Sequence, residues 1–104
     1  MDYYTEMKIG QLANTVLRAC LLDEKCVSAD EIEQLLSLEM SKLLFGLNFP
    51  VLVLEEKKDK AIGRRYYAQP LEIRKKTYYL SNHWFEPQRG KLVKWLDAHE
   101  VGRN

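Results

Sequence analysis

"LLFGLNFPVLVLEE", residues 43–56, is the stretch in which the chain changes from helical to extended periodicity. Upstream of it the apolar residues recur at intervals of three and four, as they do on one face of a helix. Gly46 predicts the end of the last of these helices, because glycine enters the left-handed conformation without a steric penalty. After Pro50 the run VLVL is rich in apolar and β-branched residues and predicts a strand. Helices followed by strands in one short chain predict an α+β fold.

The first predicted helix lies between Thr5 and Leu22. Its apolar residues fall at i, i+3, i+4, i+7, i+8, i+11 and i+12, which places them on one side of a helix: Ile9, Leu12, Ala13, Val16, Leu17, Cys20 and Leu21. The charged run Asp23-Glu24-Lys25 breaks this period, so we expect the helix to end there.

Two short helices are predicted next. Ser28 is expected to cap a helix that starts at Ala29, while the Glu31 side chain returns to the Ser28 amide. Ser37 is expected to cap another, in which helical spacing continues to Phe45. Two short helices around Ser37, after a longer first helix, predict a three-helix unit that contains a helix-turn-helix.

Two hairpins are predicted in the second half of the chain. The first joins VLVLEE (residues 51–56) to RRYYAQ (residues 64–69) through a long charged tip. The second joins LEI (residues 71–73) to TYYLS (residues 77–81) and turns at Arg74-Lys75-Lys76. That turn lacks the Asn-Gly pair that favours tight hairpins.

Consecutive side chains of a strand point to opposite faces of the sheet, so each tyrosine pair must be divided between the two faces. In the second hairpin, the side chains expected over the core are those of Leu71, Ile73, Tyr78 and Leu80. The side chains expected to look outward are those of Thr77, Tyr79 and Ser81. The same alternation separates Tyr66 from Tyr67, and one of these two rings is expected at the surface beside Arg64 or Arg65.

Length and composition indicate one globular domain. The chain has 104 residues, of which 46% are hydrophobic and 30% are charged. One modest core is expected at this length, and the composition excludes disordered and collagen-like classes. The N-terminal residues contain neither a basic region nor an apolar run, and the longest apolar stretch is too short for a membrane span. We therefore expect a cytoplasmic protein that does not interact with membranes.

The cysteines and histidines do not form a recognisable site. Cys20 and Cys26 match neither a CxxC redox pair nor a zinc half-site, so reduced thiols in or near the core are expected. A zinc site that recruits them with His83 and His99 is the minor alternative. The sequence also has no nucleophile motif and no phosphate-binding glycine loop. We expect no metal, no cofactor and no enzymatic activity.

The net charge of +1 conceals an uneven distribution. Residues 1–56 carry ten acidic and four basic side chains, whereas residues 57–104 carry five acidic and twelve basic ones. Cations that neutralise phosphate, together with exposed aromatic rings, are typical of nucleic-acid-binding surfaces. Such a surface is predicted to include Lys57, Lys58, Lys60, Arg64, Arg65, Arg74, Lys75, Lys76 and Tyr79. The alternative is structural, because basic residues at loop ends and edge strands discourage aggregation and tyrosines favour sheets.

The segment MSKLLFGLNFPVLVLEEKKDKAIGRRYY (residues 40–67) resembles the third helix, second strand, wing and third strand of winged helix-turn-helix domains. CVSADEIEQLL (residues 26–36) similarly resembles the short first strand and second helix of that class. The resemblance covers about residues 9–68. It implies a winged core over about residues 6–69, followed by a hairpin and helix extension over about residues 70–100.

The resemblance also implies DNA binding, with the third helix in the major groove and the wing along the backbone or minor groove. The corresponding helix, SLEMSKLLF (residues 37–45), offers only Glu39, Ser41 and Lys42 as polar groups for base edges or phosphates. We therefore expect Ser41 and Lys42 to contribute, and we expect binding of double-stranded DNA with low sequence specificity.

The C-terminal region is rich in large aromatic side chains. PQRGKLVKWLDAH (residues 87–99) predicts a final helix, with Pro87 in its first turn. The rings of Trp84, Phe85 and Trp95 represent much apolar area, which either covers the sheet or forms an interface with another protein or a second copy of the chain.

Two functions follow from these features. The first is a small non-enzymatic nucleic-acid-binding protein, with regulation as a candidate role, that uses a basic wing and an aromatic–basic hairpin to bind DNA. The second is a protein-interaction module built on the same scaffold, without nucleic-acid binding.

Overall fold

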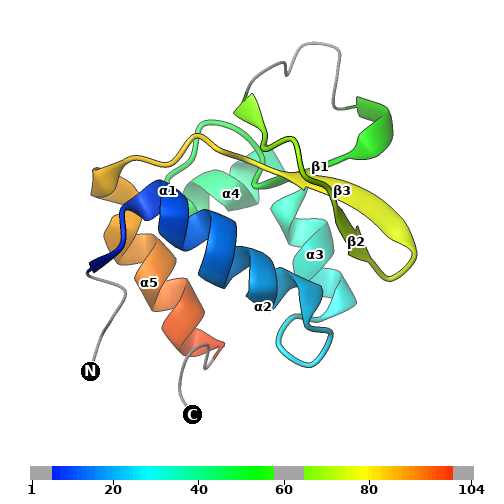
Figure 1. The fold of residues 1–104 in the computed structure, drawn as a ribbon, viewed down its shortest axis with the longest axis horizontal. Coiled ribbons are helices and arrows are strands. Elements are labelled where there is room, and N and C mark those ends of the chain that lie inside the picture. The colour runs from blue at the N-terminus through cyan, green and yellow to red at the C-terminus, as the bar shows by residue number, and fades with distance from the viewer. Residues whose placement is uncertain (1–5, 58–64, 100–104) are drawn as a thin grey trace.

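The computed structural model describes residues 6–57 and 65–99. These residues form helices and one antiparallel sheet, as the α+β prediction requires (Figure 1). In chain order the elements are α1 (Ile9–Leu12), the π-helical turn η2 (Ala13–Leu17), α2 (Arg18–Leu22), α3 (Ala29–Leu35), α4 (Leu38–Phe45), β1 (Leu52–Leu54), the 3-10 turn η3 (Glu55–Lys57), β2 (Leu71–Ile73), β3 (Lys76–Leu80), the 3-10 turn η5 (Glu86–Gln88) and α5 (Arg89–Ala98).

The first predicted helix is confirmed as a continuous helical segment from α1 through η2 to α2. All seven apolar residues of its predicted face are buried. The backbone at Asp23 is extended, so the helix ends where the charged run begins. Burial of this one face against the rest of the molecule supplies most of the stability of such a helix.

The local signals around α3 and α4 are also confirmed. The Ser28 hydroxyl accepts from the Glu31 amide at 3.1 Å, and the Glu31 carboxylate accepts from the Ser28 amide at 2.9 Å. The Ser37 hydroxyl accepts from the Met40 amide at 3.2 Å at the start of α4. Gly46 ends α4 with a φ of +76°, in the left-handed region. Each cap stabilises its helix by about 1 kcal/mol.

The second hairpin forms with the predicted core-facing residues. Leu71 lies opposite Tyr78 and Ile73 lies opposite Lys76. The side chains of Leu71, Ile73, Tyr78 and Leu80 are all buried. The turn contains only Arg74 and Lys75, whose φ angles of +50° and +72° are both positive, and Lys76 already belongs to β3. The turn therefore has the backbone of a two-residue hairpin without the residues that favour it.

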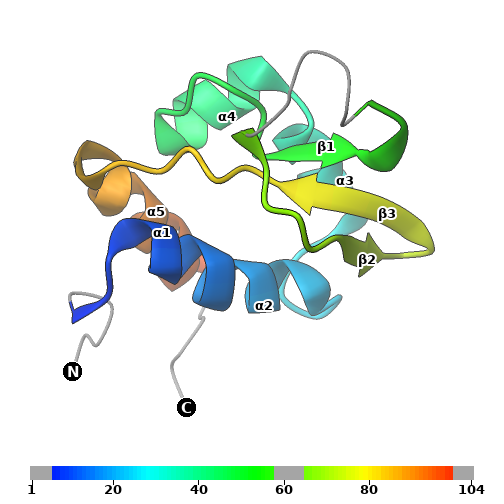
Figure 2. The same cartoon turned by 45° about the horizontal axis from the view of Figure 1, so that its top comes forward.

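The first predicted hairpin does not form among the described residues. The order of strands is β1-β3-β2, with β3 in the centre (Figure 2). β1 pairs with β3 rather than with the RRYYAQ segment, and Tyr66 of that segment forms a bridge with Ser81. Residues 65–73 thus follow one side of residues 76–82 while β1 follows the other. Pro70 interrupts the first side because proline has no amide hydrogen for the ladder.

Two expectations about exposure are wrong. Ser81 is fully buried rather than outward-facing, because the chain stays paired just beyond β3: Ser81 forms a bridge with Tyr66, and its amide donates to the Val51 carbonyl. Neither tyrosine of the RRYY phrase is exposed. Tyr66 is buried and donates to the Pro50 carbonyl at 2.8 Å, whereas Tyr67 is half-buried and donates to the Gly10 carbonyl at 2.9 Å.

The final helix is confirmed with a slightly later start. Pro87 lies in η5, and α5 follows from Arg89. α5 packs against α4 and lies at the opposite end of the molecule from the β2–β3 turn (Figures 1 and 2). Its core contact is aromatic, because Phe45 of α4 lies 5.6 Å from the ring of Trp84 and 5.6 Å from the ring of Trp95.

Candidate functional site

A groove of about 300 Å3 runs between α4 and α5. Apolar side chains form most of it, and two lysines of α5 stand at its edge. The residues that line it are Leu43, Leu44, Lys91, Lys94, Trp95 and Ala98. Leu43 is 67% exposed, the highest value among the large hydrophobic side chains of the described residues. The exposed side chain of Leu43 and the apolar lining of the groove together form one apolar patch at the surface.

The way α4 is packed explains why Leu43 faces outward. Phe45 and Ser41 point into the core and are fully buried. The Ser41 hydroxyl accepts from the Val51 amide at 2.9 Å and donates to the Leu35 carbonyl at 3.4 Å. The expectation that Ser41 contacts a nucleic acid is therefore wrong for this structure, because its side chain is enclosed between α4 and the start of β1.

The exposed face of α4 is mixed in character. Its exposed side chains are Leu38, Glu39, Lys42 and Leu43. Leu38 is 48% exposed, so two leucines and one carboxylate accompany the single cation. Phosphate contacts require cations or hydrogen-bond donors, and this face offers few. Two of the four exposed side chains of this face are therefore apolar, one is acidic and one is basic.

The lysines at the groove edge are placed by α5. Lys91 donates to the Leu43 carbonyl at 3.3 Å, near the C-terminal end of α4 where the helix dipole favours a positive charge. Lys94 lies one turn further along α5 and is exposed. Both side chains therefore place positive charge beside the apolar lining.

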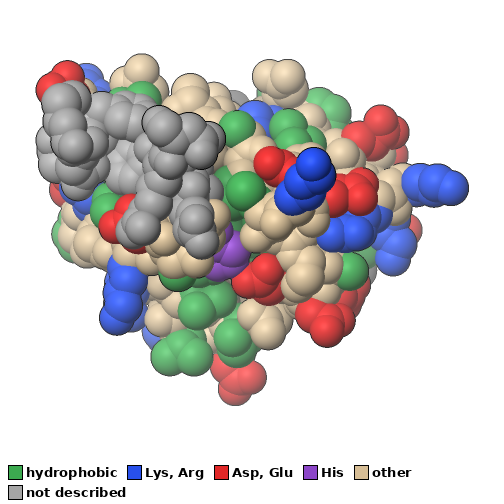
Figure 3. Space-filling view, turned by 90° about the horizontal axis from the view of Figure 1, so that it is seen from below, with side chains coloured by type: hydrophobic (Ala, Val, Ile, Leu, Met, Phe, Trp, Pro, Cys, Tyr) green, Lys and Arg blue, Asp and Glu red, His purple; other side chains and the backbone are tan. Residues whose placement is uncertain are grey.

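The cations of the β2–β3 turn have acidic neighbours. Arg74 donates to the Val27 carbonyl at 3.0 Å and lies 3.6 Å from the Glu24 carboxylate. Glu24 and Glu72 line a surface depression together with Arg74 and Lys75. Acidic and basic side chains are likewise interspersed on the face shown in Figure 3. Attraction of a polyanion to this turn is weakened by these carboxylates.

Two of the remaining predicted cations, Lys42 and Lys76, belong to different elements, α4 and β3. Lys76 is exposed beside Glu55 and Glu56. Lys42 is exposed on α4, whereas Arg74 and Lys75 belong to the β2–β3 turn. Tyr79 is half-buried. The side chain of Lys57 and the whole of Lys58, Lys60 and Arg64 lie outside the described residues.

Arg65 belongs to a row of aromatic contacts that the sequence did not indicate. Its guanidinium lies 4.4 Å from the centre of the Phe49 ring. Phe49 meets His83 edge to face at 5.3 Å, and His83 meets Phe85 edge to face at 5.4 Å. Phe85 is 57% exposed at the end of this row. No local pattern predicts the row, because its four members come from three separate segments of the chain.

The predicted aromatic interface is divided between core and surface. Trp84 is 5% exposed, and its indole donates to the Ser81 carbonyl at 2.7 Å. Trp84 is therefore a core residue and cannot form an interface in this structure. Trp95 is mostly buried, yet one part of it lines the groove. Phe85 is the member of the three whose ring is open to solvent.

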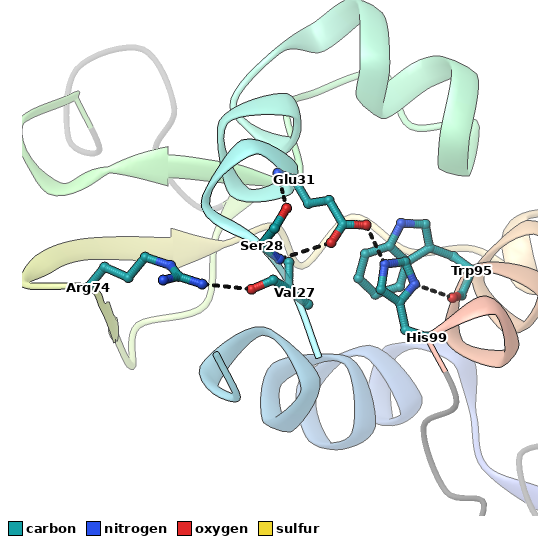
Figure 4. A network of polar contacts seen from close by, with 6 residues as sticks. All are labelled: Val27, Ser28, Glu31, Arg74, Trp95 and His99. Atoms are coloured by element: carbon teal, nitrogen blue, oxygen red, sulfur yellow. Dashed lines mark hydrogen bonds and ion pairs between the residues drawn. The ribbon is translucent and has the colours of Figure 1, made fainter. Parts of the chain in front are cut away.

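A polar network fastens α5 beside α3 (Figure 4). His99 Nε2 lies 2.6 Å from the Glu31 carboxylate, and His99 Nδ1 donates to the Trp95 carbonyl at 2.8 Å. Burial by itself raises the pKa of Glu31, but hydrogen bonds from the Ser28 amide and from His99 outweigh it and bring the pKa below its ordinary value. The network therefore joins the C-terminal end of α5 to the start of α3.

The zinc alternative has no geometric support in the part of the chain that is described. No group of three or more His, Cys, Asp or Glu side chains in residues 6–57 and 65–99 is arranged to hold a metal ion. His83 contacts Phe49 and Phe85, whereas His99 contacts Glu31 and Trp95. Cys20 and Cys26 are both free thiols.

Comparisons of the chain with protein-family models, with curated proteins and with solved structures find no match. Within the described residues, no helix is both long enough and apolar enough to cross a membrane.

Proposed function

We propose that this protein is a non-enzymatic protein-interaction domain whose α4–α5 groove binds an acidic amphipathic helix of another protein. The observation that carries this proposal is the exposure of Leu43, at 67%, beside the apolar lining of the groove. An amphipathic helix laid in a hydrophobic groove is a recurrent mode of recognition, in which a few apolar side chains provide the anchors.

The charge of the partner follows from the groove edge. Lys91 and Lys94 stand on one side of the apolar lining, and Lys42 is exposed on α4. Carboxylates that flank the apolar face of a partner helix would meet these lysines. Complementary charge of this kind increases the association rate and selects among partners more than it adds affinity.

The proposal is tested with a synthetic helical peptide that carries leucines at i, i+4 and i+7 and glutamates on both sides of them. Chemical shifts of backbone amides are followed during titration into the full chain. Binding should perturb residues of α4 and α5, and Leu43→Ser should weaken it by about tenfold, because the buried area of one leucine is lost.

Leu22→Ser is the matched control, since Leu22 is also an exposed leucine, at 46%, but lies at the end of α2 away from the groove. A peptide with lysines in place of the glutamates should bind more weakly. The proposal is wrong if the acidic peptide perturbs no residue of α4 and α5, or if Leu22→Ser weakens binding as much as Leu43→Ser.

Nucleic-acid binding is the second candidate, and the row formed by Arg65, Phe49, His83 and Phe85 favours it. The exposed ring of Phe85 at one end of the row can stack on an unpaired base, while the guanidinium of Arg65 at the other end meets phosphate. Titration with a single-stranded and a double-stranded oligonucleotide at several salt concentrations tests this candidate. Affinity that falls steeply with salt and is reduced by Phe85→Ala supports it, whereas no binding at low salt rejects it.

A further inference from the structure

The connection between α2 and α3 brings the two cysteines of the chain together. Cys20 lies in α2, and Cys26 lies in the connection that leads to α3. The Asp23 amide donates to the Cys20 carbonyl at 3.1 Å, and the Cys26 amide donates to the Asp23 carbonyl at 2.9 Å. Two successive turns, each closed by a hydrogen bond between residues three apart, therefore fold the chain back after Cys20 and keep Cys26 near it.

The two thiols lie near each other. Cys26 packs against the hydrophobic cluster that contains Cys20, and its thiol is close enough to contribute to the raised pKa of Cys20. Cys26 Sγ also lies 3.7 Å from the Asp23 carboxylate. Cys20 is buried, whereas Cys26 is partly exposed, so a small molecule in solution can reach only the second thiol without opening the fold.

We propose that Cys20 and Cys26 form a modification site at which hydrogen peroxide converts the two thiols into an intramolecular disulfide. In the first step the sulfur of Cys26 attacks peroxide, the O–O bond breaks, and Cys26 sulfenic acid and one water are formed. In the second step the sulfur of Cys20 attacks the sulfenic sulfur, the S–O bond breaks, and the hydroxyl leaves as water with the thiol proton. Both thiols are oxidised and one peroxide is reduced.

The environment of Cys20 assigns it the second step. Burial, followed by the neighbouring Cys26 thiol, raises the pKa of Cys20 to about 12. Cys20 therefore remains a thiol at neutral pH and attacks slowly, and because it is buried the neighbouring Cys26 sulfenic acid reaches it more readily than peroxide does. Closure of the disulfide should accelerate as the pH rises, because the thiolate is the attacking species.

Closure would fix the segment that leads into α3. The Val27 amide donates to the Asp23 carbonyl at 3.2 Å, and the Val27 carbonyl accepts from Arg74. Ser28, which caps α3, follows directly. A covalent bond across this connection restricts its opening, so the amides of Cys26 and Val27 should exchange with solvent more slowly in the oxidised protein.

The experiment treats the full chain with hydrogen peroxide and maps its cysteines by mass spectrometry under non-reducing conditions. The expected product is a monomer that has lost two hydrogens and in which Cys20 is linked to Cys26. Cys20→Ala should stop at a sulfenic acid on Cys26 that dimedone traps, and Cys26→Ser should leave Cys20 unmodified. Alanine is chosen at the buried position because it keeps a small apolar side chain there.

Amide exchange of the wild-type chain, before and after oxidation, provides a readout that does not depend on either variant being folded. The proposal is overturned if Cys26 proceeds to sulfinic acid while Cys20 stays reduced, or if the product is a dimer linked through Cys26. It is also overturned if both thiols of the folded wild-type chain stay unmodified under peroxide.

Discussion

His99 Nε2 lies 2.6 Å from the Glu31 carboxylate and joins the end of α5 to the first turn of α3. The other ring nitrogen donates to the Trp95 carbonyl, which can only accept, so it carries a proton. A hydrogen bond from Nε2 to an ionised carboxylate requires a second proton on the ring. The contact is therefore complete when His99 is positively charged and Glu31 is negatively charged. The stacking of His99 on Trp95, with ring centres 3.8 Å apart, holds this geometry.

Removal of this contact should destabilise the docking of α5. His99→Gln is expected to lower the free energy of unfolding by about 1–2 kcal/mol, because a charge-assisted hydrogen bond and a stacked ring are lost. Urea unfolding measures the effect. Glu33→Gln on the exposed side of α3 is the matched control and should change stability by less than about 0.5 kcal/mol. If Glu31→Gln and His99→Gln add without coupling in a double-mutant cycle, the contact contributes nothing.

The same contact predicts how stability depends on acid. The pKa of Glu31 is lowered in the folded protein from its ordinary value of 4.5. A carboxyl with a depressed pKa stabilises the fold above its unfolded pKa, and that contribution is lost as the pH falls through the folded pKa. The urea midpoints of wild type and Glu31→Gln should therefore differ more above pH 4.5 than below it, and they should converge as the pH falls through the lowered pKa of Glu31. A difference that stays constant down to acid pH would contradict this assignment.

Lys75→Gly should stabilise the β2–β3 turn. Lys75 has a φ of +72°, a conformation that costs a residue with a β-carbon about 1 kcal/mol and glycine very little. Thermal unfolding of the variant is the measurement, and we expect a higher midpoint. Lys76→Gly is the control, because Lys76 lies in β3 opposite Ile73, where glycine weakens a strand. Equal effects of the two substitutions would show that the turn conformation is not the cause.

Ser41→Ala should lower the free energy of unfolding without changing the affinity for the acidic peptide. The Ser41 hydroxyl is the acceptor for the buried Val51 amide at 2.9 Å. Its loss leaves that amide without a partner, at a cost of about 1–3 kcal/mol. Chemical denaturation measures this loss of stability. Under conditions in which wild type and Ser41→Ala are both fully folded, their affinities for the acidic peptide should be equal. A loss of affinity without a loss of stability would place Ser41 at the binding surface instead.

Local signals in the sequence were sufficient for the helices. The Ser28–Glu31 and Ser37 caps, and the stop at Gly46, each involve residues within one turn of one another. The one-sided first helix and the core-facing residues of the β2–β3 hairpin follow from simple periodicity. These features are short-range, so the amino-acid order alone determines them.

The partners of each element were decided by tertiary packing. The apolar run of β1 identified a strand but did not identify the strand beside it. In the structure β1 forms its backbone hydrogen bonds with β3 and not with the RRYYAQ segment. Ser41 had the sequence context of a surface helix residue, and only the approach of Val51 showed it to be buried. Periodicity tells which side of an element is apolar, but not what covers it.

The candidate sites are also features that tertiary packing decided. The sequence presented the cations of residues 57–76 as one group, yet the fold places carboxylates beside Arg74 and Lys76 and stacks Arg65 on Phe49. The exposed Leu43 and the contact between Glu31 and His99 both depend on where α5 lies. The sequence by itself determined which elements form, because those signals act within a few residues. The tertiary structure decided which side chains remain accessible, because accessibility depends on segments far apart in the chain.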